Sequence, residues 1–390
     1  MFVNKLKVKI RTIMALRRTL PPFLYWKKKF KSDPLFNMSN IEKGLLPHLA
    51  STSSSKNSRV GVAERILAAY HFAARDQEKQ PSVYKVSNEW IPIFRKPLQP
   101  LLEALDRGDA KKLSDLLDNF FRSPISVGLI GLATNMATNF FENSPSRYLK
   151  YQLLIDSVYR YRLLQKLIPG VQPKDLYIED IGNPYGLYVD GEFTRTGVDY
   201  QYYYAYYVAQ LLEINPNNSV VAELGGGIGG FAYFLNKLRS SRLTYINLDL
   251  PEILCISSYQ LLNLYPDKNV LLYGERDQID SEVISKYDIA LLPSFMIECI
   301  GDNSVDVSFN SYSLAEMDAN TVTNYATQLS RISSNAILHV NHVSDSLIGA
   351  DQFPFDYKKF KLISRTRAEW NLGRNLHCDE YEFLLKRKGI

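Results

Sequence analysis

The sequence predicts an α/β protein in which a doubly wound, mostly parallel β-sheet follows an all-helical N-terminal region. Residues 220–390 alternate between apolar runs of strand length and segments with helical spacing, whereas residues 59–167 show helical spacing almost throughout. In addition, the first of these strands runs directly into a glycine-rich turn and then a helix. Strands that alternate with helices form parallel sheets with helices on both faces, and this rule gives the fold class.

Composition is that of a water-soluble enzyme. The 390 residues are 46% hydrophobic, which is enough for a large core and about two domains. No stretch has the length and uniform apolarity of a transmembrane helix. The three cysteines, Cys255, Cys299 and Cys378, are odd in number and far apart, so neither a disulfide framework nor a thiolate metal site is predicted. A cytoplasmic location is therefore expected.

Residues 1–58 are predicted to form a basic amphipathic arm that ends in a Ser-rich linker at 51–58. Residues 1–31 contain ten Lys or Arg residues and no acidic residue, so the other 36 basic residues face 41 acidic ones. The basic residues of the arm are interleaved with apolar ones, as in segments that lie on anionic lipid. A peripheral position on the inner membrane face is one interpretation; a solvated tail or a docking helix for a protein partner is the other.

Residues 59–175 are predicted to form a helical accessory domain. Apolar side chains recur at helical spacing over 62–73 and 113–120. A longer helix is expected over 148–167, because Pro169 and Gly170 follow it as helix breakers. Alternation and turn residues over 177–193 then predict a β-hairpin.

Residues 176–390 are predicted to form the cofactor-binding domain. Its parallel strands are expected at 220–224, 244–248, 288–292, 305–309 and 336–341, and two more strands at 360–365 and 381–386; residues 269–273 have no clear assignment. Six tyrosines between positions 200 and 207 crowd a predicted helix that precedes the first strand. Aromatic faces attract cations and stack on sugars, so these tyrosines are candidates for covering a ligand. Packing of the helix on the sheet is the alternative explanation.

The glycine-rich turn at 225–230 has the character of a nucleotide-cofactor loop, because glycines let a ligand approach the backbone and the following helix offers free N–H groups. It fits both G-x-G-x-x-G of dinucleotide-binding proteins and, with Glu223, E-x-G-x-G-x-G of S-adenosylmethionine enzymes. Asp249 ends the next strand, where either class places an acceptor for ribose hydroxyls. The spacing of Asp249 and Glu252 also fits a helix capping box. Glu223 and the late position of the turn favour S-adenosylmethionine.

Several separated segments together resemble the family of bacterial sugar O-methyltransferases, which are class I S-adenosylmethionine-dependent enzymes. The segments are residues 119–124, 182–186, 223–231, 249–252 and 310–317. The resemblance implies a Rossmann-like sheet whose last strand inserts antiparallel, S-adenosylmethionine as cofactor, and a sugar or glycan acceptor in cell-surface polysaccharide biosynthesis. A nucleic-acid partner is not expected. An NAD-type oxidoreductase, or a non-catalytic cofactor-binding scaffold at the membrane, remains the alternative.

Candidate cofactor-binding residues follow from the rule that open α/β sheets bind ligands beyond the carboxyl ends of their strands. The resemblance adds Arg195, as a partner for the methionine carboxylate or else a surface charge, and Tyr203, as a cover for the sulfonium. The candidates at the strand ends are Glu223, Gly225, Gly226, Gly227, Gly229, Asp249, Leu250, Pro293, Ser294 and Asn310.

Methyl transfer to an alcohol requires in-line placement of the acceptor oxygen and removal of its proton. His342, which follows the fifth strand, is the candidate base, unless it only bonds to backbone. Glu316 is the second candidate, although Ser313 and Glu316 also have capping-box spacing. No metal-ligand set is predicted, because His339 and His342 are an odd interval apart and face opposite sides of a strand. Mg²⁺ is compatible with the carboxylates near the cleft, but no spacing requires it.

Overall fold

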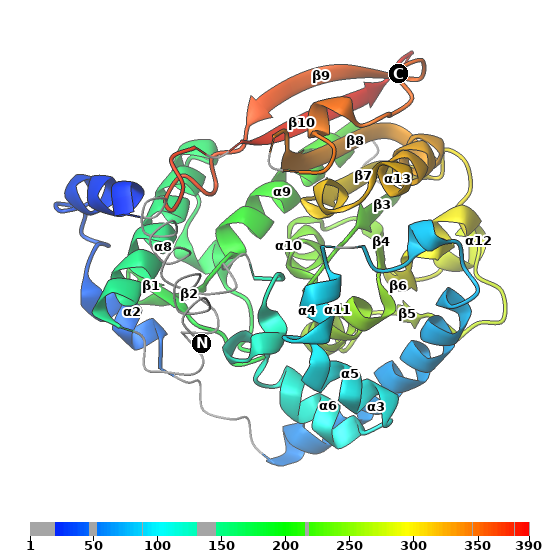
Figure 1. Cartoon of the computed structure of the whole chain (residues 1–390), viewed down its shortest axis with the longest axis horizontal. Helices are drawn as coiled ribbons and strands as arrows, with labels where there is room; N and C mark the ends of the chain where they lie inside the picture. The colour runs from blue at the N-terminus through cyan, green and yellow to red at the C-terminus, as the bar shows by residue number, and fades with distance from the viewer. Residues whose placement is uncertain are drawn as a thin grey trace, which may run out of the picture.

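An eight-stranded sheet forms the centre of the computed structural model, which describes residues 20–46, 53–87, 89–130, 146–214, 218–344, 346–377 and 379–389. Its strand order is β5-β6-β4-β3-β7-β8-β10-β9 (Figure 1). The strands are β3 (Asn218–Leu224), β4 (Arg242–Asp249), β5 (Val270–Leu272), β6 (Ile289–Pro293), β7 (Val305–Ser311), β8 (Ser333–His342), β9 (Phe360–Arg367) and β10 (Glu380–Arg387).

The sheet is parallel except at one strand. β10 lies between β8 and β9 and is antiparallel to both, whereas the pairs from β5 to β8 are all parallel. The insertion of the last strand agrees with the resemblance, and the seven expected strands are all present. Residues 269–273, which had no assignment, contain β5, a short strand at the edge beside β6. The predicted mostly parallel α/β sheet is therefore confirmed.

Helices cover both faces of the sheet, as in a doubly wound fold. Alternate strand residues enter two buried clusters, so Val221 packs on one face and Ala222 on the other. The first face carries α9 (Val198–Leu211), α10 (Gly230–Leu238) and α11 (Pro251–Leu264), and the second carries α12 (Ser281–Ile284) and α13 (Ala319–Ile332). The loops between strands and helices therefore converge at the carboxyl ends of the strands.

The N-terminal half is helical in its described residues up to position 176, and the hairpin β1 (Gly186–Val189) and β2 (Glu192–Arg195) follows it. Its α-helices are α2 (Met38–Gly44), α3 (Ser53–Gln77), α4 (Ile91–Arg95), α5 (Gln99–Asp106), α6 (Ala110–Leu117) and α8 (Arg147–Leu167). Short 3₁₀ turns occur along the chain at Ser82–Tyr84, Phe120–Arg122, Pro124–Ser126, Pro173–Leu176, Leu212–Ile214, Ser294–Cys299, Ser313–Glu316 and Ala350–Gln352.

The described residues of the helical region share a core with the sheet. α3 packs against α11, and buried side chains of both regions belong to one continuous cluster. In Figure 1 the helices α3 to α6 lie against one side of the sheet, next to α11. Because of this contact, residues of the helical region reach the carboxyl ends of the strands.

Two expectations about the N-terminus differ from the structure. Residues 53–58, predicted as part of a linker, form the first turns of α3; serine costs little in a helix, and α3 packs on α6 and α11. The described part of the arm is docked, not extended. Residues 20–29 are helical, and the Trp26 indole N–H donates to the Leu372 carbonyl at 2.7 Å. Residues 1–19 of the predicted arm lie outside the described residues. None of the described helices is long and apolar enough to span a bilayer.

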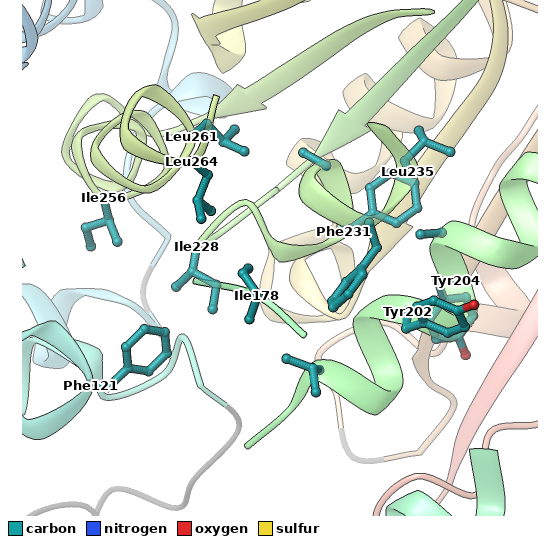
Figure 2. Close-up of a cluster of buried hydrophobic side chains, with 14 of the residues drawn as sticks. Phe121, Ile178, Tyr202, Tyr204, Ile228, Phe231, Leu235, Ile256, Leu261 and Leu264 are labelled. Carbon is teal, nitrogen blue, oxygen red and sulfur yellow. The ribbon is translucent and has the colours of Figure 1, made fainter. Parts of the chain in front are cut away.

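The glycine-rich turn is anchored from behind by apolar side chains. Ile228 and Phe231, on either side of Gly229 and Gly230, are 5% and 4% exposed. Figure 2 shows both side chains in the buried cluster between α9, α10 and α11. The Phe231 ring also stacks on Phe309 of β7, with centroids 4.5 Å apart. The apolar side chains hold the turn in place, and its backbone lies at the surface of a cavity at the carboxyl ends of the strands.

Candidate active site

A cavity of about 570 Å³ lies at the carboxyl ends of the parallel strands, a volume in the range of small-molecule sites. Its wall includes residues that follow β3, β4, β6 and β7, and the last residue of β8. The helical region adds to the wall with Trp90 and Arg160. Of the predicted site residues, Glu223, Gly225, Gly226, Gly227, Asp249, Leu250, Ser294, Glu316 and His342 line this cavity.

The glycine turn at one end of the cavity requires glycine for two reasons. Gly225 has φ of +78°, a conformation that side chains disfavour. At Gly226 a Cβ atom would come within 2.5 Å of Asn247 Oδ1, which accepts a hydrogen bond from the Gly226 N–H. The turn ends at Gly229, which caps α10 without a side-chain hydrogen bond, so the first N–H groups of this helix are available to an anionic or polar ligand.

Asp249 stands where the sequence placed an acceptor for ribose hydroxyls. Its carboxylate accepts hydrogen bonds from the N–H groups of Gly227, at 3.0 Å, and Leu250, at 2.8 Å. The alternative of a capping box is wrong, because the N-cap of α11 is Leu250 and no side chain caps the helix. Burial raises the pKa of Asp249 to about 7. The two N–H donors fix the carboxylate at the cavity wall, and its other lone pairs remain for a ligand.

Glu223 lies at the end of β3, and its carboxyl group is buried beside the turn. The Tyr245 hydroxyl of the neighbouring strand β4 donates to Glu223 Oε2. Burial raises the pKa of Glu223 to about 8, although the Tyr245 hydrogen bond opposes the rise. In the ligand-free protein, this group is therefore protonated over most of the neutral range.

The raised pKa of Glu223 predicts a pH dependence of stability. A carboxyl group whose pKa is higher in the folded than in the unfolded protein stabilises the fold at low pH, and this contribution is lost as pH rises towards 8. The Tm of the ligand-free wild-type protein should fall between pH 5 and 9, and this fall should be smaller in Glu223→Gln. The corresponding difference in unfolding free energy is on the order of a few kcal/mol. Glu282→Gln, at an exposed surface ion pair, is the control. Parallel Tm curves for wild type and Glu223→Gln would contradict the assignment.

Three predicted cofactor residues at the strand ends do not reach the cavity. Gly229 and Pro293 are absent from its lining, although their neighbours Gly230 and Ser294 are part of it. Asn310 is fully buried, and its amide donates to the Leu224 carbonyl at 2.9 Å and to Ser313 Oγ at 2.6 Å. Asn310 therefore supports the start of the glycine turn from below.

Arg195 and Tyr203, the two residues added by the resemblance, also lie outside the cavity lining. The Arg195 guanidinium is buried over the Phe121 ring and donates to Gln201 Oε1 at 3.4 Å. Gln201 itself lines the cavity, so Arg195 stands one side chain away from it. The tyrosine-rich helix α9 does cover the cavity, but with other rings. Tyr200 and Tyr204 line it, whereas the Tyr203 ring packs against Trp370.

His342 lines the cavity at the end of β8 and is held by a carboxylate. Its Nδ1 lies 2.9 Å from Asp379 Oδ1, and the Asp379 carboxylate is fixed in turn by the Ser344 N–H at 2.8 Å. When Nδ1–H donates to Asp379, Nε2 is the ring atom that can accept a proton. The alternative, a histidine bonded only to backbone, is wrong. His339, as expected, has a different environment, stacked on Phe383 with centroids 4.6 Å apart.

Glu316 lines the cavity and contacts the helical region. Its Oε2 accepts a hydrogen bond from the Trp90 indole N–H at 2.6 Å, and no side-chain cap forms in the turn Ser313–Glu316. The capping-box alternative is therefore wrong. Burial raises the pKa of Glu316, and the nearby His342 opposes the rise. Glu316 thus links the two halves of the chain at the cavity wall, through Trp90, and lies close enough to His342 for an electrostatic effect on its own pKa.

Tyr312 has the most unusual backbone in the site. Its φ is +65°, a conformation that a bulky side chain adopts at a cost of about 1–3 kcal/mol. The ring stacks on Tyr200 of α9, with centroids 5.8 Å apart, and lies 5.6 Å from the His342 ring. The strained turn after β7 therefore places an aromatic face between the tyrosine helix and the candidate base.

The sequence did not identify several residues of this site. Asp379 lies just before β10, and only the fold shows its contact with His342. Trp90, Arg160 and Arg374 come from three separate regions without a local motif. Within the described residues, no group of three or more His, Cys, Asp or Glu side chains is arranged to hold a metal ion.

No protein-family model matches the chain, and no curated protein sequence matches it. Solved structures resemble about half of it at low identity. Phosphoethanolamine N-methyltransferase 1 of Haemonchus contortus, in complex with phosphoethanolamine and S-adenosylhomocysteine, is 12% identical over 48% of this chain and 44% of its own, with a TM-score of 0.32. The PH0226 protein of Pyrococcus horikoshii is 8% identical over 49% of this chain and 92% of its own, with a TM-score of 0.34.

The glycopeptide N-methyltransferase MtfA, complexed with S-adenosylmethionine, is 13% identical over 47% of this chain and 92% of its own, with a TM-score of 0.31. The first of these three solved proteins is matched over less than half of its length. Likenesses this distant carry no argument about function.

Proposed function

We propose that the protein is an S-adenosylmethionine-dependent O-methyltransferase that methylates a hydroxyl group of a sugar or glycan in cell-surface polysaccharide biosynthesis. One observation carries the proposal. A single cavity has the glycine turn and Asp249 in one part of its wall and an imidazole held by a carboxylate, His342 with Asp379, in another. The first pair suits an adenosine-bearing cofactor, and the second suits removal of a proton from a hydroxyl group.

The wall contains the kinds of groups that bind S-adenosylmethionine in other proteins. The turn and the uncapped start of α10 offer backbone N–H groups, and Asp249 offers a carboxylate for the ribose hydroxyls. Tyr200, Tyr204 and Tyr312 present aromatic rings to the cavity, and such rings attract a cation like the sulfonium. When bound, this cofactor supplies a methyl group that reacts by in-line displacement.

The residues of the chain supply positioning and a base. His342 Nε2 would accept the proton of the acceptor hydroxyl while the wall of the cavity positions that hydroxyl for the methyl group that a bound cofactor would supply. Asp379 holds the imidazole ring and stabilises the cation that forms on it. Tyr312 and Glu316 complete the wall around the reacting groups.

Cofactor binding and methyl transfer test this proposal together. We expect calorimetry to show binding of S-adenosylhomocysteine and not of NAD, and labelled S-adenosylmethionine to transfer its methyl group into cell-envelope saccharides. Binding of NAD in place of S-adenosylhomocysteine would identify a dinucleotide enzyme, since the turn also fits that pattern. Binding of S-adenosylhomocysteine without any transfer would identify a cofactor-binding scaffold.

We also propose that the protein acts in the cytoplasm, on the inner face of the membrane. The helix at residues 20–29, dark blue at the left of Figure 1, exposes Leu20, Leu24 and Tyr25 by 42%, 57% and 52%. Exposed lysines, among them Lys28 and Lys31, lie on the same segment. Apolar side chains among lysines are the composition that binds anionic lipid surfaces.

Vesicle binding provides a test of the membrane proposal. We expect the protein to sediment with vesicles of phosphatidylglycerol and phosphatidylcholine, and much less with phosphatidylcholine alone. Replacing both Lys28 and Lys31 with glutamine should weaken binding by about 2 kcal/mol, or roughly 30-fold, at low salt. Lys286→Gln, at an exposed ion pair near α12 on the other side of the molecule, is the control. Equal binding to both kinds of vesicle would contradict the proposal.

A further inference from the structure

Two arginines line the cavity beyond His342. Arg160 comes from α8, and Arg374 comes from the segment between β9 and β10. Arg160 is 7% exposed, and Arg374 is half-buried. Guanidinium groups remain charged at any pH near neutrality, so burying two of them in one wall requires compensating negative charge.

One carboxylate lies between the two arginines. Asp156 Oδ2 is 3.2 Å from Arg160 Nε, and Asp156 Oδ1 is 3.3 Å from Arg374 Nε. Two other carboxyl groups, Asp199 and Glu380, act on Arg160 at longer range, but burial raises the pKa of both, that of Asp199 to about 7. Both guanidinium groups also form part of the cavity wall, so this end of the cavity presents two positively charged groups to a ligand.

Polar contacts connect the arginines to the candidate base. Arg160 Nη2 donates to Asn371 Oδ1 at 2.7 Å, and the Asn371 amide donates to Glu380 Oε1 at 2.6 Å. Glu380 Oε1 lies 3.9 Å from His342 Nε2, the ring atom assigned to proton removal. A ligand group held by the arginines is thus only a few side chains away from the hydroxyl that would react.

We propose that the acceptor carries an oxyanion, a carboxylate or a phosphate, which Arg160 and Arg374 bind while a neighbouring hydroxyl faces His342. Guanidinium groups bind either oxyanion through paired, charge-assisted hydrogen bonds. This inference rests on the proposed function and deepens it, because it names the class of acceptor. It favours a uronic acid or a phosphorylated sugar over a neutral one.

Anion binding to the full chain, loaded with S-adenosylhomocysteine, tests the inference. Inorganic phosphate and acetate are the probes, titrated at fixed ionic strength while Tm is measured. We expect at least one of them to raise Tm, and Arg374→Gln to weaken its apparent affinity by about tenfold or more. Arg59→Gln, which breaks an ion pair with Asp118 outside the cavity, should leave the affinity unchanged. A larger effect of phosphate would favour a phosphorylated acceptor, and a larger effect of acetate would favour an acceptor with a carboxylate.

A second variant guards against a folding defect. Arg374→Gln leaves Asp156 with one partner fewer, so the double variant with Asp156→Asn removes the opposite charge as well and should also lose anion affinity. Equal Tm responses of wild type and both variants, or no response of the wild type to either anion, would overturn the inference. Failure of S-adenosylhomocysteine to bind would instead overturn the proposed function, so the two failures are distinguishable.

Discussion

Replacing His342 with alanine is expected to lower methyl-transfer turnover by about 10²- to 10⁴-fold, the usual contribution of a positioned general base. The affinity for S-adenosylhomocysteine should stay within about twofold, because the cofactor contacts lie at the glycine turn and Asp249, away from His342 in the cavity wall. Turnover is measured with labelled cofactor, and affinity by calorimetry. His71→Ala, at an exposed histidine of α3, is the matched control.

Two further variants separate the roles around this base. Asp379→Asn should reduce turnover less than His342→Ala and change its pH profile, because Asp379 acts by orienting the imidazole. Glu316→Gln keeps an acceptor for the Trp90 indole and should cost less than about tenfold. Wild-type turnover in His342→Ala together with a large loss in Glu316→Gln would show that Glu316 is the base.

Replacing Asp249 with alanine is expected to weaken S-adenosylhomocysteine binding by about 100-fold or more. Two ribose hydroxyls would lose a charged acceptor, and each hydrogen bond to a charged group is worth about 1.5–3 kcal/mol. The N–H groups of Gly227 and Leu250 would also lose the carboxylate that holds the turn in place. Calorimetry gives the dissociation constants directly.

The control for this prediction lies on the same sheet. Asp306 accepts a backbone hydrogen bond from the Val220 N–H at 2.8 Å, near the other end of β3, so Asp306→Ala removes a similar carboxylate far from the cavity. It should lower stability and leave cofactor affinity unchanged. If Asp249→Ala bound S-adenosylhomocysteine as tightly as wild type, the proposal that Asp249 accepts hydrogen bonds from the ribose hydroxyls would be wrong.

The sequence predicted the strands, and the glycine turn and Asp249 at the cavity wall, because local patterns determine these features. The apolar run before Gly225 and the acid at the end of β4 are adjacent to the turns that they serve. Boundaries were less predictable. β8 begins at Ser333, although its first residues, Ser333 to Asn335, are polar, because pairing with β7 extends the strand beyond its apolar part.

The part of the cavity around His342 depends on contacts that no local pattern encodes. Arg160 and Trp90 precede His342 by about half and about two-thirds of the chain, and no local motif distinguishes either of them. Spacing also misled the interpretation of capping boxes. Glu316 bonds to Trp90 instead of its own turn, since a tertiary donor was available and Tyr312 takes a left-handed conformation just before it.

The antiparallel insertion of β10 brings the segment after β9 back over the carboxyl ends of the parallel strands. This one return carries Arg374 and Asp379, while the glycine turn and Asp249 belong to strands near the middle of the sheet. Under the proposed function, selectivity for the acceptor and affinity for the cofactor would depend on different stretches of sequence. Such a division would let one stretch diverge without loss of the other's role.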